Sequence, residues 1–199
     1  MSDSQRRVGV SRRAFLQGTS AVAAASALHQ QAPTAGAQEQ SGEVIRGKSV
    51  VTLDVNGVKR KVSVEPRTTL LETLRYQLDL TGAKPVSGDG SSGASTVLVD
   101  GKPVMASTTL TITCHNKSIT TAEGLSDDPI PAAFVRHDAQ QCGFCTPGFV
   151  VAIKAFLQKH PNATEDEIRK SLNGNICRCG TYANIIDAVV DLAKGGANG

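Results

Sequence analysis

The 199-residue chain contains no tryptophan, and aromatic residues make up only 4% of it, while hydrophobic residues make up 40%. Its cores are therefore expected to be aliphatic and of modest size. It has five cysteines, which are too few for a scaffold held together by disulfides. The length is enough for one domain of ordinary size or for two small ones.

An excess of charge of one sign is also missing once the amino end is set aside. Residues 1–37 contain four arginines and Asp3, and these account for the whole formal net charge of +3. The rest of the chain is neutral, so nothing in it suggests a nucleic acid or an anionic membrane as a partner.

Residues 1–37 have the order of regions that is typical of a targeting segment. Arg12 and Arg13 stand in Ser-Arg-Arg-Ala-Phe-Leu, a twin-arginine pattern, and Ala35–Ala37 offers a cleavage site. The small-residue stretch between them, 18–28, is too short to span a bilayer. A basic arm that binds nucleic acid is the alternative. The order of the regions favours a twin-arginine signal, which predicts a bacterial periplasmic protein without a membrane span.

Residues 38–47 are polar and are expected to form a flexible tail, and residues 48–124 are expected to form a small sheet with one helix. Apolar and polar residues alternate at 51–55, and Asn56-Gly57 is a strong hairpin signal because both positions tolerate positive φ. Thr69–Glu72 is a capping box that predicts a helix start. Further short strands are expected at 96–99 and 103–105, and around Ile112 and Ile119. Together these elements predict a β-grasp, the fold of plant ferredoxins.

Residues 125–195 have a helical pattern. Thr146 is expected to cap a helix that has Pro147 at its first position, and Thr164–Glu167 is a second capping box. A last helix is expected around 185–190. Four helices around two cysteine loops would make a second domain, so the chain is predicted to be an α+β protein with a domain boundary between 124 and 130.

Four of the five cysteines form two pairs. Cys142 and Cys145 are spaced C-x2-C, and Cys177 and Cys179 are spaced C-x-C. Thiolates are soft ligands that select zinc or an iron–sulfur cluster. A C-x-C pair is tight for two corners of one zinc tetrahedron, and fits better if its sulfurs share one iron of a larger cluster or are splayed by a bend. The spacing favours iron–sulfur and leaves zinc and disulfides as alternatives, and Cys114 is expected to be a small buried hydrophobe.

Both cysteine motifs are long enough to carry a resemblance. His-Asp-Ala-Gln-Gln-Cys-Gly-Phe-Cys-Thr-Pro-Gly (137–148) and Gly-Asn-Ile-Cys-Arg-Cys-Gly-Thr-Tyr (174–182) resemble the distal cluster motifs of the molybdenum hydroxylase family. In particular, they are similar to the small subunits of xanthine dehydrogenase-like and aldehyde or isoquinoline oxidoreductase-like enzymes. The resemblance runs from about Lys48 to about Ala193.

The resemblance implies that the four paired cysteines hold one [2Fe–2S] cluster. It also implies that a large partner subunit holds a molybdopterin beside this cluster. Gln141 would contact that pterin, and Cys179 would be the cluster ligand nearest to it. His137 is expected to be structural, because four thiolates already complete the cluster site.

The first domain departs from the family. Plant-type ferredoxin clusters use C-x4-C-x2-C followed by a distant fourth cysteine. The same places hold Ser87, Ser92, Ser95 and Ser107. A serine hydroxyl is a hard donor that does not ionise near neutral pH, so we expect no second cluster in this chain.

These expectations describe an exported electron-transfer subunit with no catalytic acid, base or nucleophile of its own. Its single cluster would take electrons from the molybdenum site of the partner. Without a second cluster, the usual electron path toward a flavin is in doubt. A cytochrome or a copper protein is then a candidate electron acceptor. The alternatives are an assembly and export subunit with a structural cluster, and a free-standing zinc-binding module.

Overall fold

The computed structural model describes residues 11, 13 and 45–195. Nearly all of the expected signal segment, 1–37, and most of the expected tail, 38–47, lie outside these residues. Residues 45–195 belong to one compact unit. Within the described part of the chain, no helix is both long enough and apolar enough to cross a membrane.

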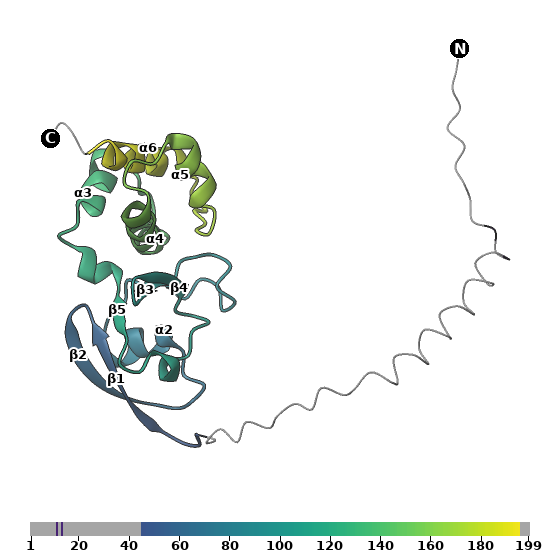
Figure 1. Cartoon of the computed structure of the whole chain (residues 1–199), viewed down its shortest axis with the longest axis vertical. Coiled ribbons are helices and arrows are strands. Elements are labelled where there is room, and N and C mark those ends of the chain that lie inside the picture. Colours follow the sequence, from purple (N-terminus) through teal and green to yellow (C-terminus); the bar gives the residue numbers. More distant parts are fainter. Residues whose placement is uncertain (1–10, 12, 14–44, 196–199) are drawn as a thin grey trace, which may run out of the picture. The chain divides into compact units, whose positions relative to one another are not determined.

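Among the described residues, five strands form one mixed sheet with the order β2-β1-β5-β3-β4 (Figure 1). β1 (Ser49–Val55) and β2 (Val58–Val64) form an antiparallel hairpin. β5 (Ser118–Thr120) runs parallel to β1 and antiparallel to β3 (Thr96–Val99), which pairs with β4 (Lys102–Met105). The expected strands at 51–55, 96–99 and 103–105 are therefore confirmed.

The hairpin turn forms where the sequence predicts it. Asn56 has φ 52° and Gly57 has φ 79°, the two positive values that a tight hairpin turn needs. Val51, Leu53 and Val55 are buried on one face of β1. The strand therefore has one face toward the core, as its alternation predicts.

The predicted capping box forms at Thr69, whose side chain and backbone both bond to Glu72. The helix that follows, α2 (Leu70–Glu72), widens at once into a π-helical turn over Thr73–Gln77. The strand expected around Ile112 is wrong, because Thr111–Cys114 forms a 3₁₀ turn. The buried hydroxyl of Thr111 lies 2.8 Å from that of Thr73, the first residue of the π-helical turn.

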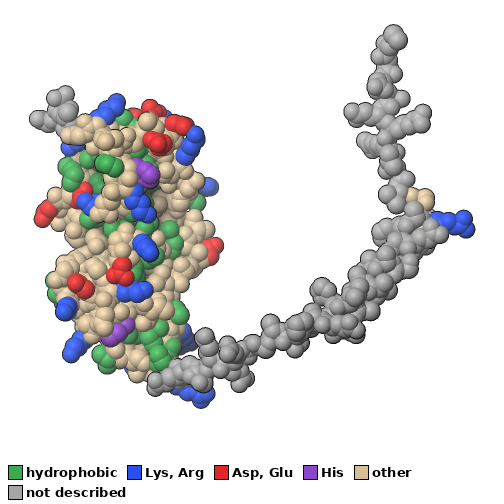
Figure 2. Space-filling model, in the orientation of Figure 1, with side chains coloured by type: hydrophobic (Ala, Val, Ile, Leu, Met, Phe, Trp, Pro, Cys, Tyr) green, Lys and Arg blue, Asp and Glu red, His purple; other side chains and the backbone are tan. Residues whose placement is uncertain are grey.

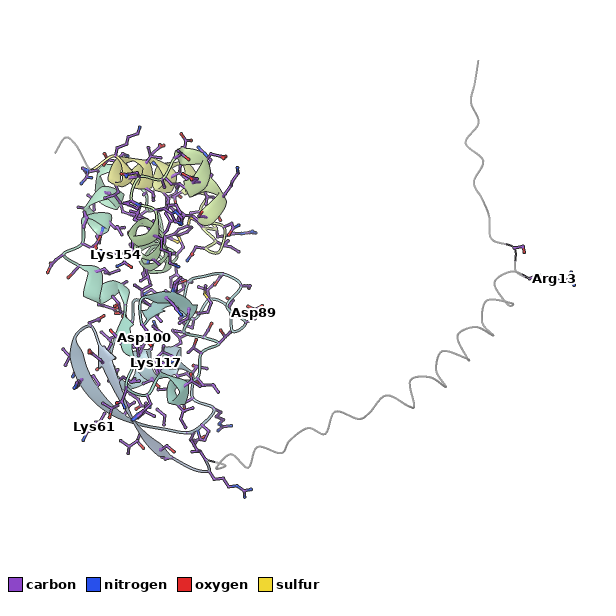
Figure 3. The ribbon with its side chains drawn as sticks, viewed as in Figure 1. Arg13, Lys61, Asp89, Asp100, Lys117 and Lys154 are labelled. Atoms are coloured by element: carbon purple, nitrogen blue, oxygen red, sulfur yellow. The ribbon has the colours of Figure 1, made fainter. Side chains whose placement is uncertain are left out.

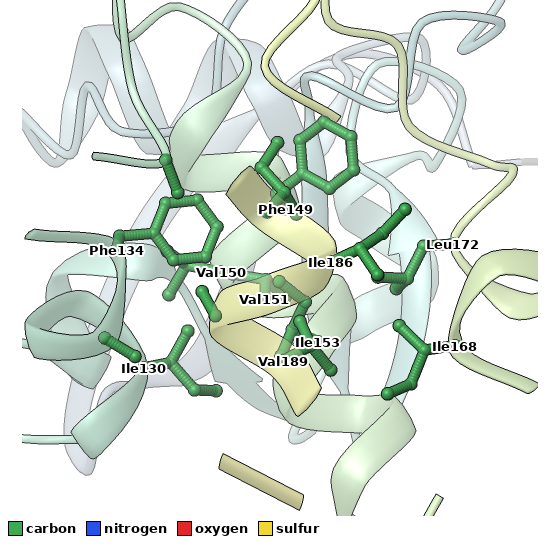
Figure 4. Close-up of a cluster of buried hydrophobic side chains, with 14 of the residues drawn as sticks. Ile130, Phe134, Phe149, Val150, Val151, Ile153, Ile168, Leu172, Ile186 and Val189 are labelled. Carbon is green, nitrogen blue, oxygen red and sulfur yellow. The ribbon is translucent and has the colours of Figure 1, made fainter. Parts of the chain in front are cut away.

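The second half of the chain contains α3 (Pro129–Arg136), α4 (Thr146–Lys159), α5 (Glu165–Ser171) and α6 (Tyr182–Ala193). The capping box predicted at Thr164 is present at the start of α5. Side chains of all four helices and the residue after α5 meet in one aliphatic cluster with two phenylalanines (Figure 4). Its labelled members are Ile130, Phe134, Phe149, Val150, Val151, Ile153, Ile168, Leu172, Ile186 and Val189.

β3 joins the two halves, because all four of its residues are buried. Val97 and Val99 belong to the hydrophobic cluster of the sheet and α2, whereas Leu98 belongs to the cluster of the helices. Alternate residues of a strand point to opposite faces, so this apolar strand is covered on both sides, with α4 on one of them. A domain boundary between 124 and 130 stays a prediction.

On the face that Figure 2 shows, acidic and basic side chains of the described part are interspersed and form no large patch of one charge. Some of them pair across elements. Lys154 of α4, labelled in Figure 3, bonds to Asp128, the residue that caps α3. Interspersed charges of this kind agree with a neutral protein.

Val51→Ala should lower the free energy of unfolding by about 2 kcal/mol, because it removes two buried methyl groups from the sheet cluster. Val50→Ala is the matched control, since Val50 directly precedes Val51 in β1 and 68% of its surface is exposed. It should change the same quantity by less than about 0.5 kcal/mol. Denaturant midpoints of the mature chain measure both, and equal midpoints for the two variants would contradict the orientation of β1.

Candidate metal centre

Two loops carry the four paired cysteines. Cys142 and Cys145 lie directly before α4, and Cys177 and Cys179 lie between α5 and α6. Cys177 is buried and Cys145 is half-buried, whereas Cys142 and Cys179 are exposed. The helical core therefore holds one side of the site, and the other side faces outward.

The sulfurs meet as two pairs, and each pair takes one cysteine from each loop. Cys142 and Cys179 are neighbours that shift each other's pKa, and so are Cys145 and Cys177. Among the described residues, no three His, Cys, Asp or Glu side chains are grouped around one metal position. The C-x-C sulfurs are thus splayed, one of the two arrangements that the spacing left open.

The first loop differs in one detail from the expected capping. Cys145, not Thr146, occupies the N-cap position of α4, and Thr146 is already helical. The helix begins one residue early because the Cys145 carbonyl accepts the hydrogen bond from Phe149 N–H, at 3.1 Å. The buried Thr146 hydroxyl has no hydrogen-bond partner among the residues that the structure describes.

The second loop is fixed by the start of α6. The Cys177 N–H donates to the Tyr182 hydroxyl at 2.7 Å, and the Thr181 hydroxyl lies 3.1 Å from the Cys177 sulfur. The Tyr182 ring packs edge-on against Phe149 of α4, with 6.3 Å between ring centroids. Both cysteine loops are therefore attached to α4 and α6, the two helices that follow them.

The two cysteines of the buried pair, Cys145 and Cys177, differ in pKa. Burial raises the pKa of Cys145 to about 12, and the hydrogen bond to Cys177 acts in the same direction. Burial also acts to raise the pKa of Cys177, but hydrogen bonds from Thr181, Cys145 and the Gly180 N–H outweigh it and leave that pKa at about 7. Only one sulfur of this pair ionises readily.

The two cysteines of the exposed pair, Cys142 and Cys179, also differ in the direction of their pKa shifts. The Phe144 N–H, and then the Cys179 thiol, donate to the Cys142 sulfur and lower its pKa. The Cys142 N–H acts to lower the pKa of Cys179. The hydrogen bond to the Cys142 sulfur, burial and the negative charges of Cys142 and Cys177 together raise it.

This donor set suits a metal cluster. Two sulfurs held side by side do not both ionise, because like charges repel. A bound metal cation removes that repulsion and keeps each coordinating thiol deprotonated. Two irons that each take two protein ligands match two pairs of thiolates, and backbone N–H groups already aim at the sulfurs. The residues present therefore fit a [2Fe–2S] cluster.

The other predicted site residues have separate positions. Gln141 is exposed next to Cys142. His137 lies at the end of α3, where its ring nitrogen is 3.3 Å from Asp191 and its carbonyl accepts from Asn184. Cys114 is buried in the cluster of the sheet, away from the other four cysteines.

Sequence reasoning missed Thr181 and Tyr182 as groups that hold Cys177. Their position directly after the C-x-C was the available signal, since a loop that ends at a helix is held by the first helical residues. It also missed an apolar rim around the site, formed by Phe144, Ile176 and Tyr182. These side chains are 50%, 51% and 40% exposed. Exposed apolar side chains around a site are typical of a protein interface.

The four serines of the first half also meet as two pairs. The hydroxyl oxygens of Ser87 and Ser92 lie 2.8 Å apart, and Ser95 donates to Ser107 at 3.0 Å. Each pair is a closed hydrogen bond between neutral groups.

Comparison with known proteins identifies relatives along most of the chain. Residues 121–190 match the family of [2Fe-2S] binding domains. The chain is 43% identical over 162 residues to the aldehyde oxidoreductase iron-sulfur-binding subunit PaoA of Escherichia coli K12, with 72% of this chain and 71% of that protein covered. It is 42% identical over 144 residues to the nicotine 6-hydroxylase small subunit of Paenarthrobacter nicotinovorans, with 71% and 87% covered.

Solved structures give the same result. A chain of quinoline 2-oxidoreductase from Pseudomonas putida 86 superposes with a TM-score of 0.72 at 38% identity, covering 75% of this chain and 95% of that one. The aldehyde oxidoreductase of Desulfovibrio desulfuricans superposes with a TM-score of 0.70 at 41% identity. There the match covers 73% of this chain and 17% of a much longer one. The mixed sheet with its helices is thus the fold found in these oxidoreductases.

Tyr182→Phe should lower the free energy of unfolding by about 1 kcal/mol, because it leaves the N–H of the buried Cys177 without its acceptor. Tyr76→Phe is the matched control, since Tyr76 is 74% exposed. Thermal and denaturant unfolding of both variants measure the effect. Equal stability of the two variants would contradict the claim that the Tyr182 hydroxyl stabilises the loop that carries Cys177.

Proposed function

The chain belongs to the small [2Fe–2S] subunits of the molybdenum hydroxylase family, and from this we propose that it carries electrons away from a molybdenum site through a single cluster. Its relatives are iron–sulfur subunits of oxidoreductases, so it works as the electron-transfer subunit of such an enzyme. The cluster ligands would be Cys142, Cys145, Cys177 and Cys179. The substrate site would lie in a large partner subunit that holds the molybdopterin.

The observation that carries this proposal is the pairing of the four sulfurs across the two loops. A bound [2Fe–2S] cluster supplies a carrier that takes up and releases one electron at a time. The protein's own part is to hold two thiolates at each iron and to donate N–H groups to them. Such hydrogen bonds raise the reduction potential of a cluster.

The exposed pair supports an orientation toward the partner. Cys142 and Cys179 are exposed, Gln141 is exposed beside them, and the exposed residues of the apolar rim lie within a few positions of the cysteines in the sequence. We propose that this side docks on the large subunit. Cys179 would then be the ligand nearest the molybdopterin, and Gln141 would contact it. The buried pair, Cys145 and Cys177, would face away from that interface.

A single cluster is proposed because serines stand where a second set of cysteines is expected. Their hydroxyls bond to each other, and serine keeps its proton near neutral pH. An electron would therefore leave from the one cluster, to a cytochrome or a copper protein of the periplasm. We also propose a β-grasp domain at 48–124 and a helical cluster-binding domain at 125–195, which the two hydrophobic clusters support.

A second candidate function is a non-catalytic subunit for assembly and export, with a structural cluster. One observation favours it: Cys177 belongs to the helical core, and Cys145 packs against that core. A cluster there would cross-link the loops before α4 and α6 whether or not electrons pass through it.

The mature chain should contain about two irons and two acid-labile sulfides. Replacing any of Cys142, Cys145, Cys177 or Cys179 by Ser should bleach its visible spectrum, because one iron would lose one of its two thiolates. Cys114→Ser is the matched control and should keep the full spectrum, since that cysteine is buried in the other core.

The same preparation distinguishes the candidate functions. In the complex with the large subunit, mixing with an aldehyde or N-heteroaromatic substrate under anaerobic conditions should reduce the cluster within the turnover time. Reduction much slower than turnover would favour the assembly role. One zinc per chain without sulfide would refute both.

Changing Ser87, Ser92, Ser95 and Ser107 together to Cys should restore a second cluster, because backbone N–H groups already point at three of these four side chains. Iron should rise from about two to about four per chain, with a second paramagnetic signal on reduction. Two signals in the unchanged chain would contradict the single-cluster proposal. A folded variant with no added iron would remove only the idea that the loop keeps the shape of a cluster site.

Arg12→Lys with Arg13→Lys should leave the protein in the cytoplasm together with its large partner, because the arginine pair is the proposed export address. Arg6→Lys with Arg7→Lys is the matched control and should not alter export. Cell fractionation followed by immunoblotting measures both. Normal periplasmic delivery of the first variant would refute the export proposal.

A further inference from the structure

Three segments come into direct backbone contact beside the cysteine site. They are the serine loop (87–95), the first turn of α4 and the loop that carries Cys177. A Cβ built at Gly93 would lie 2.3 Å from the Gly174 carbonyl oxygen, and one built at Gly148 would lie 2.4 Å from the Gly93 carbonyl oxygen. Both distances are far below any real contact, so the glycines are what let the three segments touch.

Two hydrogen bonds hold the Cys177 loop on the serine loop. The Asn175 side chain, 6% exposed, donates to the Gly93 carbonyl at 2.9 Å. The Ile176 N–H donates to the Ser92 carbonyl at 3.0 Å. Because Ile176 directly precedes Cys177, these two carbonyls help to set the place of a proposed cluster ligand.

Hydrogen bonds between serine hydroxyls fix the conformation of the serine loop itself. The loop is neither helix nor strand. Ser87 and Ser92 pair through their hydroxyls at 2.8 Å, and the Ser92 N–H donates to the Ser87 hydroxyl at 3.0 Å. At the far end, Ser95 donates to Ser107 at 3.0 Å and accepts from its N–H at 3.3 Å. A hydroxyl can donate and accept at once, so the two serines of each pair can satisfy each other.

We propose that Ser87, Ser92, Ser95 and Ser107 are positioning residues for the cysteine site. The two hydroxyl pairs fix the serine loop, the Ser92 and Gly93 carbonyls fix Asn175 and Ile176, and these fix Cys177. The serines thus do more than mark a missing cluster, since they stabilise the geometry of the remaining one. This inference rests on the proposed cluster at the four cysteines.

The test uses the full mature chain with its cluster. Ser87→Ala with Ser92→Ala removes one hydroxyl pair, and Ser95→Ala with Ser107→Ala removes the other. Ser91→Ala is the matched control in the same loop, because Ser91 is exposed and its N–H and hydroxyl both donate to Asp89, which Figure 3 labels. Ser87→Thr with Ser92→Thr keeps the hydroxyls and serves as the rescue.

Two readouts do not depend on enzyme activity: the paramagnetic signal of the reduced cluster and the rate of iron loss to a chelator. Either alanine pair should shift the signal and speed iron loss several-fold. The Ser91→Ala and threonine variants should match the parent. If a double variant does not fold, Ser87→Ala and Ser107→Ala alone remove one partner of each pair and should give the same effects, smaller in size.

Folded alanine variants with the parent's signal and rate of iron loss would overturn the inference and leave the proposed function intact. An equal effect of Ser91→Ala would also overturn it, because the loop as a whole would then be responsible. A parent chain that holds no cluster would overturn the proposed function and this inference together.

Discussion

Repulsion between neighbouring sulfurs is the constraint around which the helical half is built. Each of the two pairs contains one thiol whose pKa is lowered and one whose pKa is raised. A bound cation stabilises adjacent thiolates, and the protein contributes by holding the two loops next to each other. It does so by placing each loop directly before a long helix, α4 or α6. The residues that begin α6 bond to Cys177.

The helices keep that position because a strand of the sheet supports them. β3 is buried on both faces, with Leu98 in the helical core and Val97 and Val99 in the core of the sheet. A substitution on either face of this strand should therefore alter the packing of both cores, since close-packed interiors transmit strain. The loop that carries Cys177 also contacts residues far from it in the sequence, among them Ser92 and Gly93 of the serine loop.

The serine loop is held by hydrogen bonds between serine side chains. Neutral hydroxyls that donate and accept satisfy each other, whereas four thiolates at the same places would need a cation. Glycines at 93 and 148 then allow backbone contact with the cysteine loops. An electron path through this half of the chain is absent from the proposed mechanism, and the half retains a role as support.

The sequence by itself determined the local features of this protein. Asn56-Gly57, the two capping boxes, the apolar face of α4 and the cysteine spacing depend on residues a few positions apart, and those interactions act wherever the segment lies. Only the tertiary structure decided which cysteines lie together and that the hydroxyl of Thr111 meets that of Thr73. It also decided that Ser92 and Gly93 meet Asn175 and Ile176. These outcomes depend on contacts between residues tens of positions apart, and local propensity contains no information about such contacts.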